Sequence, residues 1–259
     1  MSLTSACCNT PSNQDAQWHD KGEYTTLSKE IAGEKVRTYV TGPKDSKRGL
    51  IAIYDIFGYH PTGLQFFDRI AESHGGFQLS VPDIFGKEGG IDNALMGDGS
   101  KVMAWIGAHG DYKKNHIDEI IRVAVEDLRK AGCTSFSIFG QCWGTLMAVK
   151  AASEEDSPFL AVGGPHPSFI TIDAVKDVKA PLVLLASKDE ADMIPVVESV
   201  KGKNFPVESF HSRFDNMHHG WTGGRGDWTQ PEQFKAGLEA VDQLGAYFAK
   251  VASHAESKL

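Results

Sequence analysis

The chain has 259 residues, of which 41% are apolar and 23% charged, and its formal net charge is −8. This composition is too apolar for a disordered segment, and the length suits one large domain with a sizeable core. The negative charge argues against a nucleic-acid partner, because phosphates would be repelled. No run approaches the roughly 20 apolar residues that span a bilayer, so no membrane partner is expected.

Residues 1–20 are polar and are predicted to form a loose arm ahead of a single domain over residues 21–259. The arm has no apolar segment like that of a secretory signal, so the protein is not expected to be secreted. The four cysteines are too few for a disulfide scaffold, and adjacent Cys7 and Cys8 lack the spacing of zinc ligands. A reducing compartment is the simpler interpretation.

Short runs of consecutive apolar residues recur beyond the arm and are typical of parallel strands buried on both faces. They occupy residues 50–54, 77–81, 135–139, 159–162, 182–186 and 207–210. Helical periodicity lies between them, for example over 115–131 and after Thr229, which with Glu232 predicts a capping box. This alternation predicts an α/β fold with a mostly parallel central sheet and helices on both faces. Ligands of such folds bind at the carboxyl ends of the strands.

Residues 82–100 break the alternation, because they are rich in glycine and poor in apolar residues. The segment is predicted to be a long surface loop. Loops of this length in compact domains are usually lids or binding loops.

The apolar run at 135–139 is followed at once by Gly140-Gln141-Cys142-Trp143-Gly144 and then by helix-forming sequence. A G-x-S-x-G pattern between a strand and a helix indicates a nucleophile elbow, where small flanking residues permit a strained turn. Cys142 holds the nucleophile position, and a helix amino end beside it favours the thiolate. The backbone N–H of Trp143 is a candidate oxyanion donor. The alternative is that Cys142 is a small core residue.

A cysteine nucleophile needs a base, which α/β-hydrolases carry later in the chain, after an acidic residue. His219 is the predicted base, with His218 and His211 as weaker alternatives. Asp189 is predicted to orient the imidazole, and Asp192 on the same loop competes for that role.

Five motifs in order give the chain a resemblance to the dienelactone hydrolase (carboxymethylenebutenolidase) family, over residues 30–250. They are Tyr54-Asp55-Ile56-Phe57-Gly58, Pro82-Asp83-Ile84-Phe85-Gly86, Gly140-Gln141-Cys142-Trp143-Gly144, Ser187-Lys188-Asp189-Glu190 and His219-Gly220-Trp221. The resemblance implies an α/β-hydrolase fold. It also implies hydrolysis of a lactone or related ester by Cys142, His219 and Asp189, without a metal or an organic cofactor.

The resemblance implies roles for further residues of the site. A family carboxylate beside the nucleophile, commonly glutamate, holds the thiol proton, and Asp55 occupies that position with a side chain shorter by one methylene. The alternative is that Asp55 caps the following turn. The amide of Ile56 matches the second oxyanion donor of the family. Arg225 is a candidate for pairing with a substrate carboxylate. No match for a second arginine is found, so a dienelactone itself is not a secure substrate.

His166 and Trp221 are also predicted to face the substrate, although a turn position is the alternative for His166. Cys142 is thus predicted to attack a lactone or small ester and form a thioester acyl-enzyme, which water activated by His219 would hydrolyse. Two alternatives remain open: an acyl thioester as the substrate of the same triad, or a binding protein that keeps the fold without catalysis.

The last three residues, Ser257, Lys258 and Leu259, match a peroxisomal address. In a eukaryotic source they predict a peroxisomal protein with the import receptor as a partner, and otherwise a cytoplasmic protein is expected.

Overall fold

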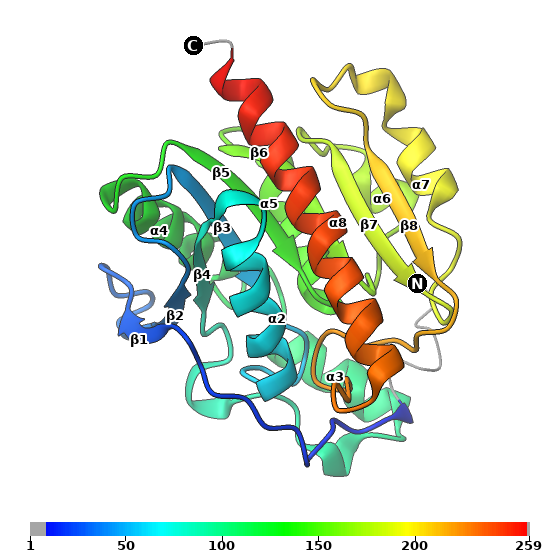
Figure 1. Cartoon of the computed structure of the whole chain (residues 1–259). Coiled ribbons are helices and arrows are strands. Elements are labelled where there is room, and N and C mark those ends of the chain that lie inside the picture. The colour runs from blue at the N-terminus through cyan, green and yellow to red at the C-terminus, as the bar shows by residue number, and fades with distance from the viewer. Residues whose placement is uncertain (1–8, 258–259) are drawn as a thin grey trace.

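The structure is a computed structural model, and it describes residues 9–257 (Figure 1). One eight-stranded sheet runs through it. The strands are β1 (Glu23–Thr26), β2 (Arg37–Thr41), β3 (Arg48–Ile53), β4 (Gln78–Pro82), β5 (Ser135–Gly140), β6 (Phe159–Pro165), β7 (Leu182–Ser187) and β8 (Phe210–Phe214). Their order is β1-β2-β4-β3-β5-β6-β7-β8. Strands β3 to β8 pair in parallel, whereas β1 and β2 join one edge antiparallel.

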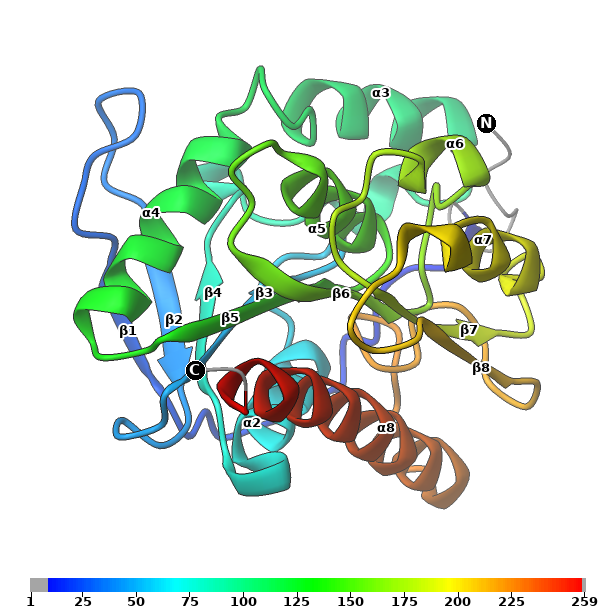
Figure 2. The same ribbon diagram turned by 90° about the horizontal axis from the view of Figure 1, so that it is seen from above.

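Helices cover both faces of the sheet, as Figure 2 shows. They are α2 (Pro61–Glu72), α3 (Gly99–His109), α4 (Ile117–Lys130), α5 (Trp143–Ser153), α6 (Ile172–Val175), α7 (Ile194–Ser199) and α8 (Pro231–Glu256). Helices α2 and α8 lie on one face, and α4, α5 and α6 lie on the other. The predicted α/β-hydrolase layering, with a mostly parallel sheet between helices, is confirmed.

The middle of the sheet forms the core because its strands are apolar on successive residues. Every residue of β5 and of β7 is buried. An aromatic cluster of Phe66, Phe67, Phe139 and Phe248 joins α2, β5 and α8 on one face. Burying each such ring contributes about 1.5–3 kcal/mol. The core therefore holds the carboxyl ends of β5 and β7 in fixed positions, where the predicted site residues begin.

Three elements differ from the sequence-based expectations. Strand β8 occupies residues 210–214 rather than 207–210, and the segment predicted as a loop up to residue 100 ends where α3 begins at Gly99. The predicted capping box is wrong, because the N-cap of α8 is Gln230. The Thr229 hydroxyl donates to Asp227 instead.

The N-terminal arm was expected to be loose over residues 1–20, but its described part is bonded to the body. The Trp18 indole N–H donates to Asp68 at 2.7 Å, and the Asn13 amide donates to the Gly224 carbonyl at 2.7 Å. Residues 1–8 and 258–259 lie outside the described residues, so the structure does not test the import address. Within residues 9–257 no helix is both long enough and apolar enough to cross a bilayer.

Candidate active site

A strained strand-to-helix turn is present where the sequence predicts the nucleophile elbow. Strand β5 ends at Gly140, α5 begins at Trp143, and between them Cys142 has φ 54° and ψ −122°. A positive φ at a residue other than glycine costs on the order of 1–3 kcal/mol. A Cβ added to Gly140 would lie 2.0 Å from the backbone carbon of Gly144, and one added to Gly144 would lie 2.6 Å from the Ile53 carbonyl oxygen. Gly140 is thus required for the turn to close on itself, and Gly144 is required for it to pack against the end of β3.

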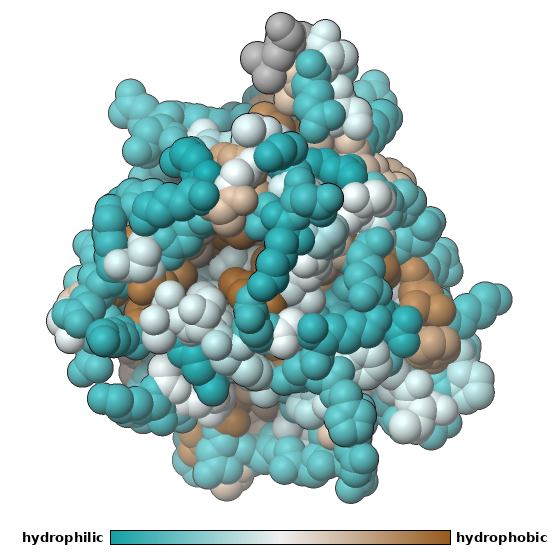
Figure 3. Space-filling view, turned by 60° about the vertical axis from the view of Figure 1, so that its left-hand side comes forward, coloured by the Kyte–Doolittle hydropathy of each residue, from teal (hydrophilic) through white to brown (hydrophobic). Residues whose placement is uncertain are grey.

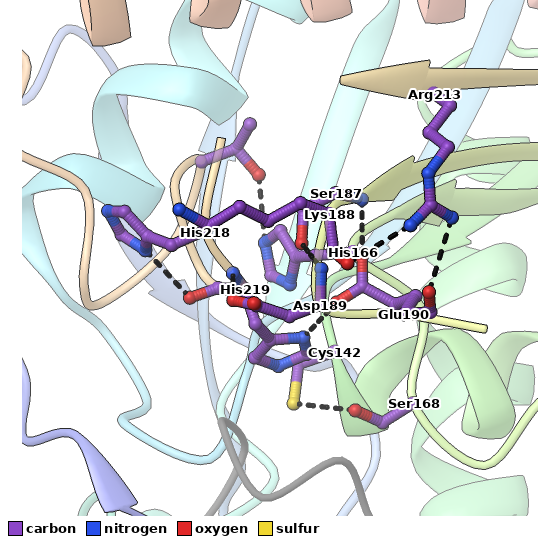
Figure 4. Close-up of polar contacts among 11 residues, drawn as sticks. Cys142, His166, Ser168, Ser187, Lys188, Asp189, Glu190, Arg213, His218 and His219 are labelled. Atoms are coloured by element: carbon purple, nitrogen blue, oxygen red, sulfur yellow. Dashed lines mark hydrogen bonds and ion pairs between the residues drawn. The ribbon is translucent and has the colours of Figure 1, made fainter. Parts of the chain in front are cut away.

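The Cys142 side chain is buried, yet it borders a small cavity. Its Sγ lies 3.4 Å from the Ser168 hydroxyl oxygen, and the Ser168 amide donates to the Cys142 carbonyl at 3.0 Å (Figure 4). Sequence reasoning missed Ser168. Its position three residues beyond the end of β6 was the only available signal, because strand ends are where such sheets carry functional residues.

The His219 ring is paired with Glu190, which corrects the expected acid. His219 Nδ1 lies 2.6 Å from Glu190 Oε1, and both side chains are 2% exposed. An ionised carboxylate only accepts, so this contact places the proton of the neutral ring on Nδ1 and leaves Nε2 as the basic nitrogen. The predicted pairing of the ring with Asp189 or Asp192 is therefore wrong in this geometry.

The carboxylates of the two aspartates near Glu190 accept hydrogen bonds from backbone amides instead. The Asp189 carboxylate accepts the His219 amide at 2.8 Å, and the Asp192 carboxylate accepts the Ile194 amide at 2.9 Å. The second oxygen of Glu190 accepts the Ser187 amide in a very short hydrogen bond. The turn after β7 thus points Glu190 inward. The Asp189 carboxylate positions His219 by accepting the main-chain amide of that residue.

His166 and Trp221, the two residues predicted to touch substrate, are core residues behind the histidine. Both have no exposed surface. The His166 ring packs edge-to-face on the His219 ring, with centroids 5.0 Å apart, and Trp221 packs on the other side of His166 at 5.3 Å. Burial, followed by the nearby His219 charge, holds the pKa of His166 well below its usual range. These residues therefore shape the surroundings of His219 and do not bind substrate in this geometry.

A narrow cavity brings several predicted residues together. Its walls are Asp55, Ile56, Phe57, Cys142, His219, Gly220 and Arg225. The Asp55 carboxylate accepts the amide of Phe57 at 2.9 Å and that of Gly224 at 2.8 Å. The structure therefore shows Asp55 capping the turn that follows it. The same carboxylate also binds the glycine-rich loop that contains Gly224.

The two predicted oxyanion donors both lie near Cys142. Ile56 borders the cavity, and Trp143 is the first residue of α5. The amide of a first helical residue has no carbonyl partner within its own helix. Arg225 supplies positive charge to the cavity wall, with its guanidinium carbon 5.4 Å from the centre of the Phe57 ring.

Elsewhere the described part of the chain offers larger clefts of different character. One of about 540 Å³ lies between β2, β4 and α4, on the hollowed face that Figure 3 turns toward the viewer. Hydroxyl and apolar side chains line it, among them Thr38, Ser80 and Leu128. It contains neither cysteine nor histidine. Among residues 9–257 no group of three histidine, cysteine or acidic side chains is placed to hold a metal ion.

The parallel sheet, the strained elbow after β5 and the histidine loop after β8 define an α/β-hydrolase fold, and solved structures of such enzymes superpose on it. A putative dienelactone hydrolase from Klebsiella pneumoniae is 16% identical with a TM-score of 0.65, and the match covers 88% of this chain and 98% of that one. A monoglyceride lipase from Saccharomyces cerevisiae is 10% identical with a TM-score of 0.59, over 90% and 97%.

Sequence comparison narrows the class to one family. The sequence model of the dienelactone hydrolase family matches residues 36–229, and the chain belongs to this family. An uncharacterized AIM2 family protein from Schizosaccharomyces pombe is 28% identical, over 88% of this chain and 92% of its own length. An endo-1,3;1,4-beta-D-glucanase from Zea mays is 26% identical, over 74% of this chain and 58% of its own length.

Proposed function

We propose that this protein hydrolyses a small ester or lactone through Cys142, His219 and Glu190. The observation that carries the proposal is the buried His219–Glu190 pair, 2.6 Å apart, on a cavity that the strained Cys142 also borders. A nucleophile, a base and a group that orients the base are the three parts of such a triad. The acid is glutamate here, in place of the aspartate expected from the sequence.

The chemistry follows from the proton positions. His219 Nε2 takes the thiol proton, and the Cys142 sulfur attacks the substrate carbonyl carbon, whose oxygen becomes an oxyanion. The amides of Trp143 and Ile56 stabilise that charge. The imidazolium then protonates the leaving oxygen as the carbon–oxygen bond breaks, which gives an alcohol and a thioester. Water, deprotonated by His219, attacks the thioester and releases the carboxylic acid and the thiol.

The cavity also favours a class of substrate. It is too narrow in this structure to hold a water molecule, so its walls must move apart to admit a substrate, and a short acyl group needs the smallest such movement. Arg225 on the same wall favours an acyl group that ends in a carboxylate, because a guanidinium pairs with it through two hydrogen bonds.

The test is hydrolysis of short-chain 4-nitrophenyl esters and of small lactones by the Cys142→Ala variant. Loss of turnover with unchanged circular dichroism is expected, whereas turnover retained by the folded variant would contradict the proposal. Cys133→Ala is the matched control, because burial raises the pKa of that thiol to about 11 and keeps it protonated. Faster turnover of acyl thioesters than of lactones and oxygen esters would instead select the thioester alternative.

A further inference from the structure

The loop that carries Arg225 has little conformational preference of its own. Arg225 stands between Gly224 and Gly226, with Gly223 before them. Glycine imposes few backbone restrictions, so such a segment takes its position from the contacts around it. The body supplies two of these contacts: Asp55 accepts the Gly224 amide at 2.8 Å, and the Thr62 hydroxyl donates to the Gly226 carbonyl at 2.9 Å.

The N-terminal arm supplies further contacts, across more than two hundred positions in sequence. The Asn13 amide donates to the Gly224 carbonyl at 2.7 Å, and the Asn13 side-chain amide donates to the Gly226 carbonyl at 3.1 Å. Asn13 thus holds the loop on both sides of Arg225. The Thr10 carbonyl accepts Arg225 Nε at 2.7 Å. Because a guanidinium is planar, this bond and the Phe57 ring beside it limit its orientation.

The arm is itself anchored, so it can transmit position to the loop. The Ser12 amide and hydroxyl both lie within hydrogen-bond distance of Asn93 Oδ1, at 2.9 and 3.2 Å. The Asn13 carbonyl accepts His60 Nε2 at 2.9 Å, at the start of α2. These anchors belong to two different parts of the body.

We propose that residues 10–13 are a positioning element for substrate specificity, which fixes the Arg225 guanidinium against the carboxylate of an acidic acyl group. The inference rests on the proposed function, because it needs an ester-hydrolysing site with Arg225 on its wall. It adds that the specificity site is completed by the arm, a segment outside the family-matched residues 36–229.

The experiment compares two esters with the same leaving group and acyl groups of similar length. These are 4-nitrophenyl hemisuccinate, which carries a carboxylate, and 4-nitrophenyl butyrate, which ends in a methyl group. Asn13→Ala removes the side-chain bond to Gly226 and is expected to raise KM for the hemisuccinate about tenfold, the effect of one hydrogen bond at the upper end of its usual range. Its kcat, and both constants for the butyrate, should change less than about twofold.

The matched control is Gln14→Ala, since the Gln14 side chain is exposed and its hydrogen bond among residues 9–257 stays within the arm, to Ser12. It should leave kcat and KM for both esters unchanged.

A double-mutant cycle adds a second readout. If Asn13 acts through Arg225, Asn13→Ala should have no further effect on KM for the hemisuccinate in an Arg225→Met background. Ser12→Ala loosens the anchor at Asn93 and serves as a second variant should Asn13→Ala fail to fold, with a smaller KM increase for the hemisuccinate expected.

The outcomes separate the two proposals. Equal losses on both esters, no loss on either, or additive effects in the double mutant would overturn the positioning role while Cys142-dependent hydrolysis still supports the proposed function. Absence of Cys142-dependent hydrolysis of either ester would overturn the proposed function and this inference with it.

Discussion

Replacing Glu190 by glutamine tests the histidine pairing most directly. The wild-type contact is a 2.6 Å hydrogen bond between side chains that are each 2% exposed, so solvent screens it little. Glutamine keeps the volume but has only one acceptor oxygen, whereas Glu190 accepts both from His219 and from the Ser187 amide. If the amide nitrogen faces the ring, Nδ1 must accept, the proton moves to Nε2, and the base is lost.

Loss of the correct tautomer in a triad of this kind lowers kcat about 10⁴-fold. We therefore expect Glu190→Gln to lower kcat by about 10³- to 10⁴-fold, or roughly 4–5.5 kcal/mol of transition-state stabilisation at 1.36 kcal/mol per decade. Asp189→Asn is the comparison, because that side chain is half-buried and can still accept the His219 amide. Steady-state hydrolysis of a 4-nitrophenyl ester across pH 6–9 measures both variants. A loss in Asp189→Asn as large as that in Glu190→Gln would refute the assignment.

Three further predictions concern packing, pH and the nucleophile. Gly144→Ala should cost more than about 3 kcal/mol in urea unfolding, because its Cβ would collide with β3 carbonyls, whereas Gly107→Ala, with open space around it, should change stability by less than about 1 kcal/mol. Burial lowers the pKa of His166 below 6.5, so the unfolded state binds an extra proton as pH falls below that value. The melting temperature should then drop from pH 6.5 to 5 less steeply in His166→Gln; equal slopes would contradict this. Ser168→Ala should raise the apparent pKa for iodoacetamide labelling of Cys142 by about one unit, if the hydroxyl donates to the thiolate, and an unchanged value would exclude that donation.

The sequence reveals those parts of the fold whose physical cause is local. Strands β5 and β7 are buried throughout, so their unbroken apolar runs are readable without coordinates. Strand β1 escapes such reading because all four of its residues are exposed, and it exists by pairing with β2. The turn at Cys142 can be predicted because its two flanking glycines and the boundary between strand and helix are both visible in the sequence.

The acid of the site could not be chosen from the sequence for a related reason. Asp189 and Glu190 are adjacent after the same strand, and only the path of the turn decides which carboxylate faces the ring. Ser168 likewise contacts Cys142, and Asn13 contacts the loop that carries Arg225, through connections whose course depends on tertiary packing. The sequence predicts well which segments carry candidate functional residues. It leaves open the direction in which each of their side chains points.

The backbone angles of Cys142 also restrict which side chains this position can accept. At φ 54° and ψ −122° a side chain branched at Cβ would crowd the main chain, so threonine is disfavoured at this position although it carries a hydroxyl. Serine has the same unbranched Cβ as cysteine and fits the corner without new contacts. Under the proposed function, serine is therefore the hydroxyl residue that could replace the sulfur nucleophile here without adjustment of the two neighbouring glycines.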